Sequence, residues 1–516
     1  MITGDNLMLL FLGWEGVGLS SYLLINFWFT RIAANQAALK AFMLNRVGDW
    51  GLNFSVLILI ALVSDLSLST IFSLAHKIDV SILLIFSLFL LIGVMAKSAQ
   101  LGLHTWLASA MEGPTPVSAL IHAATMVTAG VYLLLRFSPL LEWCPTILII
   151  ITWLGGLSAL VAASSALLEQ DIKKVIAYST TSQLGYMVVA CGLSEYNLSL
   201  FHLINHAFFK SLLFLSAGAI IHALQDQQDL RRMGSLTSLL PKTYSAIFLA
   251  SLSLLAFPFL TGFYSKDFIL ELALVPLNIT QTIAIFLTLV AALFTAAYST
   301  RLLILAFYSS PSHPLSTLHF IQDPDKFMMI PMIIAAFASA FFGYLTHELF
   351  LGLGSNITLQ SLFTHPDRYL LFDPHMIPLY LKLLPPLGLL FFISFYPFRS
   401  NSKLIINKEL SSNSTPPFYT YNFQTFIHLT MIKSLNSAIY IHRYLDRGLI
   451  ELLGPYGLLK TFHYYGFIIE SLATGFIPFY AFLIVIVPLV LFSFIYFTNL
   501  LLSSFIILLT LFFFIF

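Results

Sequence analysis

Apolar runs of about twenty residues follow one another along most of the chain, and they constrain its fold more than any other feature. A transmembrane helix needs about 20 apolar residues to cross roughly 30 Å of hydrocarbon. The runs therefore predict an all-α, polytopic transmembrane bundle of about 11–13 helices, since the alternating segments of a membrane β-barrel are absent. The expected spans are Leu7–Phe29, Phe42–Val63, Val80–Leu101, Val117–Phe137, Thr146–Leu168, Val175–Leu193, Leu198–His222, Tyr244–Leu260, Thr280–Tyr308, Met328–Tyr344, Ile377–Phe398, and one long or two short spans in Gly475–Phe516.

The composition excludes several classes of protein. Only 9% of the 516 residues are charged and 59% are hydrophobic, whereas soluble proteins carry roughly 25% charged residues. With 24 basic and 23 acidic residues, the chain has no positive field to hold nucleic acid. Its two cysteines, Cys144 and Cys191, are too few for an iron–sulfur cluster or a cysteine-based zinc site, so we expect two buried thiols.

Ionisable residues inside the expected spans are the main functional signal. Such a group at mid-bilayer costs at least about 2.5–3.5 kcal/mol, so it usually faces protein or water and marks an ion path. His202, His206 and Lys210 are spaced i, i+4, i+8, which places them on one helix face over about 12 Å. The candidate residues are Glu15, Lys97, His122, His202, His206, Lys210, Lys266 and Asp267.

Helix-breaking residues stand beside two of these groups. Pro114 precedes the segment that bears His122, and Pro258 and Gly262 precede Lys266. Proline breaks a helix, and a broken helix is tolerated in a membrane only where it lines a cavity or is buried in protein. The same pattern in two halves of a chain predicts a repeat-built transporter with its site near the midplane.

Proton transfer is the chemistry that fits these residue types. Histidine titrates near neutral pH, and a lysine enclosed in protein holds its proton less tightly because it loses hydration. Other interpretations stay open for single residues. Lys97 or Lys266 could reach the interface as a helix-end lysine, His122 could be a packing residue, and the histidine stripe has a spacing that also suits a metal.

The region after residue 400 differs from the rest. Arg399–Asn422 reads as a polar surface loop. Thr425–Leu472 mixes apolar residues with Lys, Arg, His, Asp and Glu. This composition favours an amphipathic helix on the membrane surface.

Several long strings together resemble subunit 5 of mitochondrial NADH:ubiquinone oxidoreductase, respiratory complex I. The resemblance covers about residues 4–344 and returns at about 440–480. It is carried by Gly13–Gly18, Lys97–His104, Ala110–His122, Asp171–Val175, His206–Lys210, Phe259–Asp267, Ala297–Arg301 and Asp446–Gly457.

The resemblance implies an antiporter-like subunit at the distal end of the membrane arm, built from two inverted five-helix repeats and a C-terminal surface helix. On that basis we expect a first repeat in 1–140, a second in 141–310, peripheral helices and loops in 311–424, the amphipathic lateral helix in 425–475 and a membrane anchor in 476–516. FMN and iron–sulfur clusters are expected on other subunits, and this chain is expected to bind no cofactor or metal, although lipid such as cardiolipin could be bound.

Carried over residue by residue, the resemblance gives each candidate a role in the proton path. Glu15 matches the ion-pairing glutamate and Lys97 its lysine partner on a broken helix. The other matches are His122 and Lys210 in the central hydrophilic axis, His202 and His206 in the path, Lys266 near the proton exit with Asp267 beside it, and Asp49 near the first half-channel.

One departure from the family concerns the start of the chain. The helix bearing Glu15 begins within about ten residues of Met1, whereas about four helices precede it in the family. An open polar cavity is untenable in lipid, so we expect a split subunit whose N-terminal helices come from a separate chain. Other expected partners are membrane-arm subunits, above all the neighbouring antiporter-like subunit, and membrane lipids.

The favoured function is proton translocation driven by NADH-to-ubiquinone electron transfer on other subunits, in a multi-pass, organelle-encoded protein of the mitochondrial inner membrane. The alternatives are a subunit of a sodium/proton antiporter, which shares the lysine and glutamate residues, and a structural scaffold that does not pump.

Overall fold

The computed structural model describes residues 1–63, 65–273, 279–310, 321–352, 362–363, 429, 432–433, 436–473 and 475–498. The chain forms two units, Met1–Asn422 and Phe423–Phe516. The described residues are helical except for linkers and two isolated bridges. The all-α fold predicted from the sequence is therefore confirmed.

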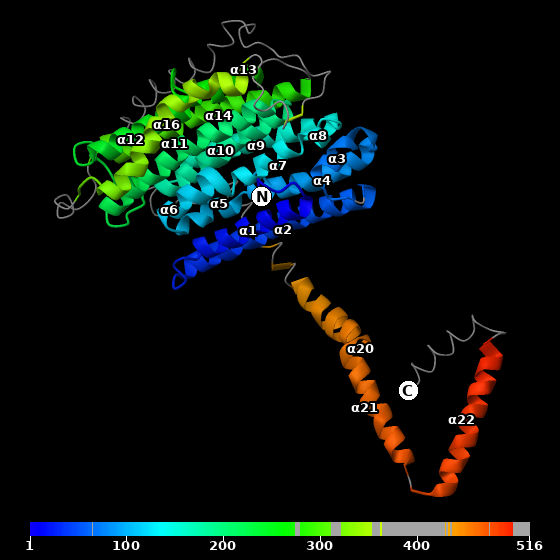
Figure 1. The fold of residues 1–516 in the computed structure, drawn as a ribbon. Coiled ribbons are helices and arrows are strands. Elements are labelled where there is room, and N and C mark those ends of the chain that lie inside the picture. The colour runs from blue at the N-terminus through cyan, green and yellow to red at the C-terminus, as the bar shows by residue number, and fades with distance from the viewer. Residues whose placement is uncertain are drawn as a thin grey trace. The chain divides into compact units, whose positions relative to one another are not determined.

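Long helices lie side by side in the first unit (Figure 1). The long helices are α1 (Leu7–Ile25), α2 (Ile32–Val63), α4 (Val80–Lys97), α9 (Pro145–Leu168), α10 (Ile172–Gly192), α11 (Tyr196–Ala223), α12 (Pro241–Leu255), α14 (Ile279–Leu303) and α16 (Lys326–Leu351). The short helical segments are α3 (Leu68–Ser73), η1 (Ala75–Lys77), α5 (Thr105–Ser109), η2 (Ala110–Glu112), α6 (Thr115–Ser118), η3 (Ala119–Thr125), α7 (Thr128–Arg136), α8 (Ser138–Leu141), η4 (Leu230–Arg232), η5 (Phe263–Asp267), α13 (Phe268–Ala273) and η6 (Ile304–Tyr308).

Within the described residues, seven helices are long and apolar enough to cross a membrane. They are α1, α2, α4, α9, α11, α16 and the continuous stretch Thr282–Tyr308 of α14 and η6. The protein is therefore a multi-pass membrane protein. α10 is too polar to count among the seven, yet nearly all its residues are buried, because neighbouring helices surround it. The expected span Ile377–Phe398 lies outside the described residues.

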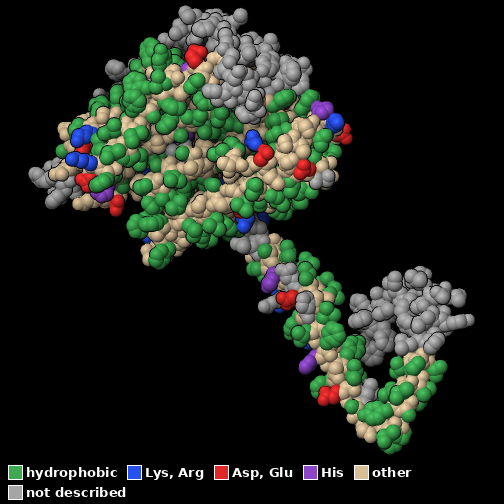
Figure 2. All heavy atoms as spheres, viewed as in Figure 1, with side chains coloured by type: hydrophobic (Ala, Val, Ile, Leu, Met, Phe, Trp, Pro, Cys, Tyr) green, Lys and Arg blue, Asp and Glu red, His purple; other side chains and the backbone are tan. Residues whose placement is uncertain are grey.

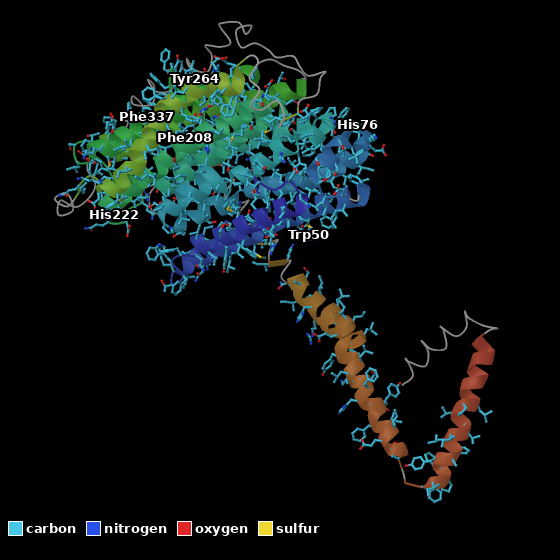
Figure 3. All side chains as sticks on the ribbon, viewed as in Figure 1. Trp50, His76, Phe208, His222, Tyr264 and Phe337 are labelled. Atoms are coloured by element: carbon cyan, nitrogen blue, oxygen red, sulfur yellow. The ribbon has the colours of Figure 1, made fainter. Side chains whose placement is uncertain are left out.

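The outer surface of this unit suits a bilayer. Figure 2 shows apolar side chains over much of the visible face, with many of the charged side chains toward the ends of the helices. His76 and His222 lie at opposite ends of the bundle, and Trp50 points away from it on α2 (Figure 3). The buried polar residues are therefore enclosed between helices rather than turned toward lipid.

Two backbone clasps repeat the same local structure. The segment before α1 pairs with the linker after α2 through the bridge Asn6–Ser67, and the segment before α10 pairs with the linker after α11 through Asp171–Asp229. Two backbone hydrogen bonds of 2.9–3.1 Å flank each bridge. The clasps are what an internal duplication would produce, whereas the repeat boundaries at residues 140 and 310 stay predictions.

The first helix break follows Lys97. α4 ends there because the backbone turns at Ala99 and Gly102, whose φ angles are 49° and 105°. The expected span to Leu101 is therefore shorter in the structure. Trp106 Nε1 donates to the carbonyl of Ala96 at 2.9 Å, which satisfies one of the acceptors that a helix end leaves free.

The second break follows α12. Ala256 ends this helix in the left-handed conformation, with φ 65°. Pro258 has no N–H to give to the carbonyl of Leu254 four residues earlier, so the helix cannot continue. A Cβ at Gly262 would lie 1.7 Å from the Ser253 carbonyl oxygen, so only glycine fits where the chain turns back.

The described part of the second unit consists of helices with mostly exposed side chains. They include η10 (His442–Ile450), α20 (Glu451–Leu453), α21 (Pro455–Leu472) and α22 (Ile477–Thr498). The segment 425–475 is thus interrupted at Gly454 rather than one continuous helix, and α22 falls in the expected anchor, 476–516. The boundaries of these two segments stay predictions.

Candidate functional site

Lys97 is the centre of the first polar cluster. Its side chain is 1% exposed, and its Nζ lies 3.9 Å from Asp49 Oδ1 of α2. Nζ also donates to the Trp14 carbonyl of α1 at 3.4 Å and lies 5.3 Å from the Trp14 ring centroid. Trp14 Nε1 donates to the same Asp49 oxygen at 2.7 Å. A buried charge needs such partners, and these contacts tie three helices together.

Glu15 belongs to a second pair beside this cluster. Its Oε1 lies 2.6 Å from an amino group of Arg46 on α2, and the two side chains are 29% and 53% exposed. Arg46 also lies 4.0 Å from Asp49 Oδ2. Two carboxylates, one guanidinium and one ammonium therefore form a connected network.

The pairing expected from the resemblance differs in the structure. The resemblance implies an ion pair between Glu15 and Lys97, whereas the close contacts are Glu15–Arg46 and Lys97–Asp49. The physical reason is geometry. Arg46 and Asp49 are three residues apart on α2, so both face α1, and the longer arginine reaches Glu15.

Gly18 shapes the place of the Lys97 amine. A Cβ at Gly18 would lie 2.9 Å from Lys97 Nζ. Gly18 is also four residues after Trp14, so the missing side chain leaves the Trp14 carbonyl open to the lysine. A Cβ at Gly16, in contrast, would meet no atom within 4 Å.

The stripe expected on one helix is carried by α11. His202, His206 and Lys210 have no exposed surface. The two imidazole centroids are 6.4 Å apart, and the ring of Phe209 lies edge-on to His206 at 5.4 Å. The three titratable groups therefore lie in protein and away from lipid.

α10 presents a matching row of polar groups to this stripe. Lys210 Nζ donates to Ser179 Oγ, and His202 Nε2 lies 3.3 Å from Gln183 Oε1. The other ring nitrogen of His202, Nδ1, lies 2.9 Å from Ser265 Oγ. Which nitrogen donates depends on the tautomer. These contacts join α11 to α10 at Lys210 and at His202, and join α11 to η5 at His202.

Lys266 completes the row at the second break. Its Nζ donates to the Leu254 carbonyl at 3.1 Å and to Thr295 Oγ1 at 3.0 Å. It lies 5.4 Å from the ring centroid of Tyr186. Lys266 and the adjacent Asp267 are both buried. The proline break thus leaves a carbonyl that the lysine amine satisfies.

Comparison with known proteins identifies the family. Residues 4–295 match the family described as NADH:quinone oxidoreductase/Mrp antiporter, TM. The chain belongs to this family. It is 50% identical over 488 residues to NADH-ubiquinone oxidoreductase chain 5 of Rhizopus stolonifer, covering 93% of this chain and 75% of that one. The protein of the same name from Aspergillus niger is 48% identical over 500 residues, covering 94% of this chain and 76% of that one.

A solved structure shows the same fold. The structure of the Mrp complex from Dietzia sp. DQ12-45-1b superposes with a TM-score of 0.68 at 26% identity. The match covers 84% of this chain and 47% of that chain. The helical bundle of this chain is therefore also found in the Mrp complex.

The structure describes the backbone of His122 alone. It lies in η3, a π-helical segment after Pro114, and the position of its side chain lies outside what the structure describes. Lys266 and Asp267 also lie in a π-helical segment, η5. Such segments often mark functional sites.

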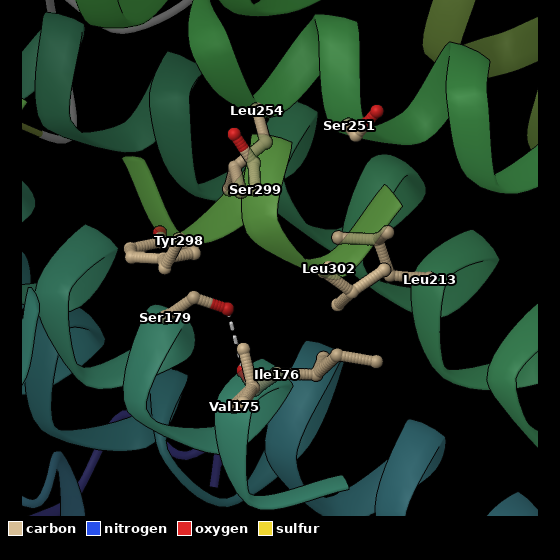
Figure 4. Close-up of a pocket in the computed structure, with 9 residues that line it drawn as sticks. All are labelled: Val175, Ile176, Ser179, Leu213, Ser251, Leu254, Tyr298, Ser299 and Leu302. Carbon is tan, nitrogen blue, oxygen red and sulfur yellow. Dashed lines mark hydrogen bonds between the residues drawn. The ribbon is translucent and has the colours of Figure 1, made fainter. Parts of the chain in front are cut away.

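A small cavity adjoins the Lys210–Ser179 contact (Figure 4). Its volume of about 10 Å³ leaves room for at most about one water molecule. Ser179 Oγ donates to the Ile176 carbonyl at 2.7 Å. The lining residues are Val175, Ile176, Ser179, Leu213, Ser251, Leu254, Tyr298, Ser299 and Leu302.

The metal interpretation of the histidine stripe finds no support among the described residues, where no three His, Cys, Asp or Glu side chains group as metal ligands. Sequence reasoning missed other residues of the site. Arg46, Ser179, Gln183 and Thr295 all contact the candidate groups. The one signal available for α10 was a hydroxyl-rich run, Ser179–Ser182, next to an amide inside an expected span.

Proposed function

We propose that this chain is the distal antiporter-like subunit of respiratory complex I and that it moves protons through its buried polar row. The electrons pass from NADH to ubiquinone on other subunits, which carry the FMN and iron–sulfur clusters. The relatives named NADH-ubiquinone oxidoreductase chain 5 cover most of this chain. We also propose their mitochondrial inner membrane as its location and organelle encoding as its origin.

The observation that carries the proposal is the enclosed row of titratable groups. Lys210, His202 and Lys266 each have a hydrogen-bond partner on a neighbouring helix. Charged groups within spans mark ion pathways when they face protein or water. A scaffold without pumping would have no use for so many buried charges, because each one is costly in lipid.

Neutral variants of the two lysines test the proposal. Lys210→Met and Lys266→Met keep length and remove the proton-binding amine. In the purified complex in proteoliposomes, we expect NADH-driven proton pumping to fall about tenfold or more. Lys242→Met is the matched control, because Lys242 is an exposed lysine in the first turn of α12. Undiminished pumping in both buried-lysine variants would favour the scaffold.

The Mrp neighbour favours one second function, sodium/proton exchange. The same assay separates the two. Exchange of sodium for protons in the absence of NADH and quinone would support the antiporter. Pumping that requires both, and that persists without sodium, supports the subunit of complex I.

We further propose that another polypeptide of the membrane arm packs on the outer face of α1 and α2. Glu15 is the ninth of nineteen residues in α1, so its pair with Arg46 sits at mid-span although half of the arginine is exposed. An ion pair at this depth needs protein or water around it. Helices of another membrane polypeptide would provide that cover.

Cross-linking tests this contact. Trp50 and Leu12 are 68% and 70% exposed on this face. A photo-reactive residue at position 50 should cross-link to a second membrane polypeptide in the intact complex, whereas one at exposed Phe337 of α16 serves as the comparison position. Labelling of lipid alone at position 50 would refute the partner.

A further inference from the structure

Glu195 occupies an unusual position at the start of α11. It is the N-cap residue of that helix, but its side chain makes no capping hydrogen bond. The preceding Ser194 has a left-handed backbone with φ 68°, and the Glu195 N–H donates to the Ala190 carbonyl at 2.9 Å. This tight turn fixes the carboxyl group in a partly buried place between α10 and α11.

A second carboxyl group, Glu142, comes from the end of α8. Glu142 is 2% exposed, and its Oε1 accepts a hydrogen bond of 2.7 Å from the hydroxyl of Tyr196. Tyr196 follows Glu195 directly, so the two acids approach one another at the same end of the bundle. Burial, together with the Glu142 carboxylate, raises the pKa of Glu195 to about 7.

Two neighbouring carboxyl groups in protein hold protons as a pair. Like charges at short distance cannot both be ionised without cost, so one proton is retained until a higher pH. Other ionisable groups toward this end include His347 of α16, whose Nδ1 lies 3.5 Å from Glu348 Oε1. They also include Asp5, His76 and Arg136, which line a cavity together with Trp143, the residue after Glu142. His347 packs against Phe201 of α11.

The helix register connects the pair to the polar row. Glu195, Ser199, His202, His206 and Lys210 are spaced by four, three, four and four residues, so they share one face of α11. Glu195 and His202 are about 10 Å apart along the axis. Between them, Ser199 Oγ accepts from Cys191 Sγ at 3.2 Å and donates to the Met187 carbonyl at 3.0 Å.

We propose that Glu142 and Glu195 share a proton and form the terminal site at which the polar row of α11 exchanges protons with water at this end of the bundle. This proposal rests on the proton-translocating function above. Glu142 and Glu195 are not among the residues of the family's motifs, so the pair adds a proton-exchange site to the row.

The test compares acid and amide side chains in the full complex in proteoliposomes. In Glu195→Gln we expect NADH-driven pumping to fall about tenfold, with partial rescue by Glu195→Asp. Infrared difference spectra should show a protonated carboxyl band that titrates near pH 7 in the natural protein and is lost in Glu195→Gln. The matched control is Glu169→Gln, a partly buried acid in the α9–α10 linker at the opposite end, which should stay within about twofold.

Tyr196→Phe provides a second readout that keeps both acids. It removes the donor to the Glu142 carboxylate, so the pair should hold its proton to a higher pH. Unchanged pumping and an unchanged carboxyl band in Glu195→Gln would overturn the terminal site. If Lys210→Met and Lys266→Met still abolish pumping in that case, only the terminal pair is wrong; if they too leave pumping intact, the proposed function fails.

Discussion

Replacing Gly18 by alanine tests whether the precise position of the Lys97 amine matters for proton transfer. The new methyl group would lie 2.9 Å from Nζ. Ordinary van der Waals contact begins at 3.4 Å, so the amine has to move by about 0.5 Å or more. The lysine side chain is flexible, and the helix backbone of α1 can remain in place.

The energetic effect follows from the contacts of the amine. With an effective dielectric constant of about 20, a change of about 0.5 Å in the 3.9 Å separation from Asp49 changes the attraction by about 0.5 kcal/mol. Loss of the 3.4 Å contact with the Trp14 carbonyl adds up to about 1.5 kcal/mol. Together they correspond to a change of roughly twofold to thirtyfold in the equilibrium that loads the amine.

Gly16→Ala is the matched control for this prediction. Gly16 lies on the same helix, and a Cβ there meets no atom within 4 Å. Both substitutions favour the helix by a similar amount, about 1 kcal/mol, so a difference between them isolates the contact with Lys97. The assay is the ratio of protons pumped to NADH oxidised in proteoliposomes. Equal ratios in the two variants would show that the position of the amine does not limit transfer.

Three more substitutions follow from the contacts. Arg46→Gln removes the guanidinium that lies 2.6 Å from the Glu15 carboxylate, so we expect pumping to slow several-fold. A double-mutant cycle with Glu15→Gln should show coupling between Arg46 and Glu15. Thr295→Val removes one of two acceptors of Lys266 and should slow pumping about tenfold, whereas Thr300→Val, whose hydroxyl bonds only carbonyls of its own helix, should have little effect. Arg301→Met removes hydrogen bonds of 2.6 and 2.7 Å to the carbonyls of Leu167 and Glu169 at the end of α9. Each bond is worth about 1.5–3 kcal/mol, so the complex should unfold at a lower temperature. An unchanged melting temperature would contradict this role.

The sequence predicts well what a single helix determines. The spacing of His202, His206 and Lys210 is enough to place them on one face, because the helical period is fixed. The break before Lys266 follows from Pro258 and Gly262, since proline removes a hydrogen-bond donor from the helix. These features depend on neighbours in the chain, so they can be read without knowing how the helices pack.

Contacts between helices are harder to predict from the sequence. The sequence around Ser179 and Gln183 does not show which helix these residues will face, because α10 is buried on nearly all sides and lacks a distinct inner stripe. The exchange of partners between Glu15 and Lys97 has the same origin. Only the packed arrangement of α1, α2 and α4 shows that Arg46 reaches Glu15 and that Asp49 takes the lysine.

The lysine beside each break donates to a backbone carbonyl of a helix, Lys97 to that of Trp14 in α1 and Lys266 to that of Leu254 in α12. The Trp14 carbonyl is open because Gly18 has no side chain, and the Leu254 carbonyl is open because Pro258 has no N–H. A carbonyl oxygen accepts a stronger hydrogen bond from a charged ammonium group than from a neutral amine. It has no hydrogen to donate to the lone pair of the neutral amine. A backbone movement at either break would therefore change how firmly the lysine holds its proton, even if every charged residue nearby stayed in place. A conformational change in another subunit needs only to bend or straighten one of these helices to shift that balance.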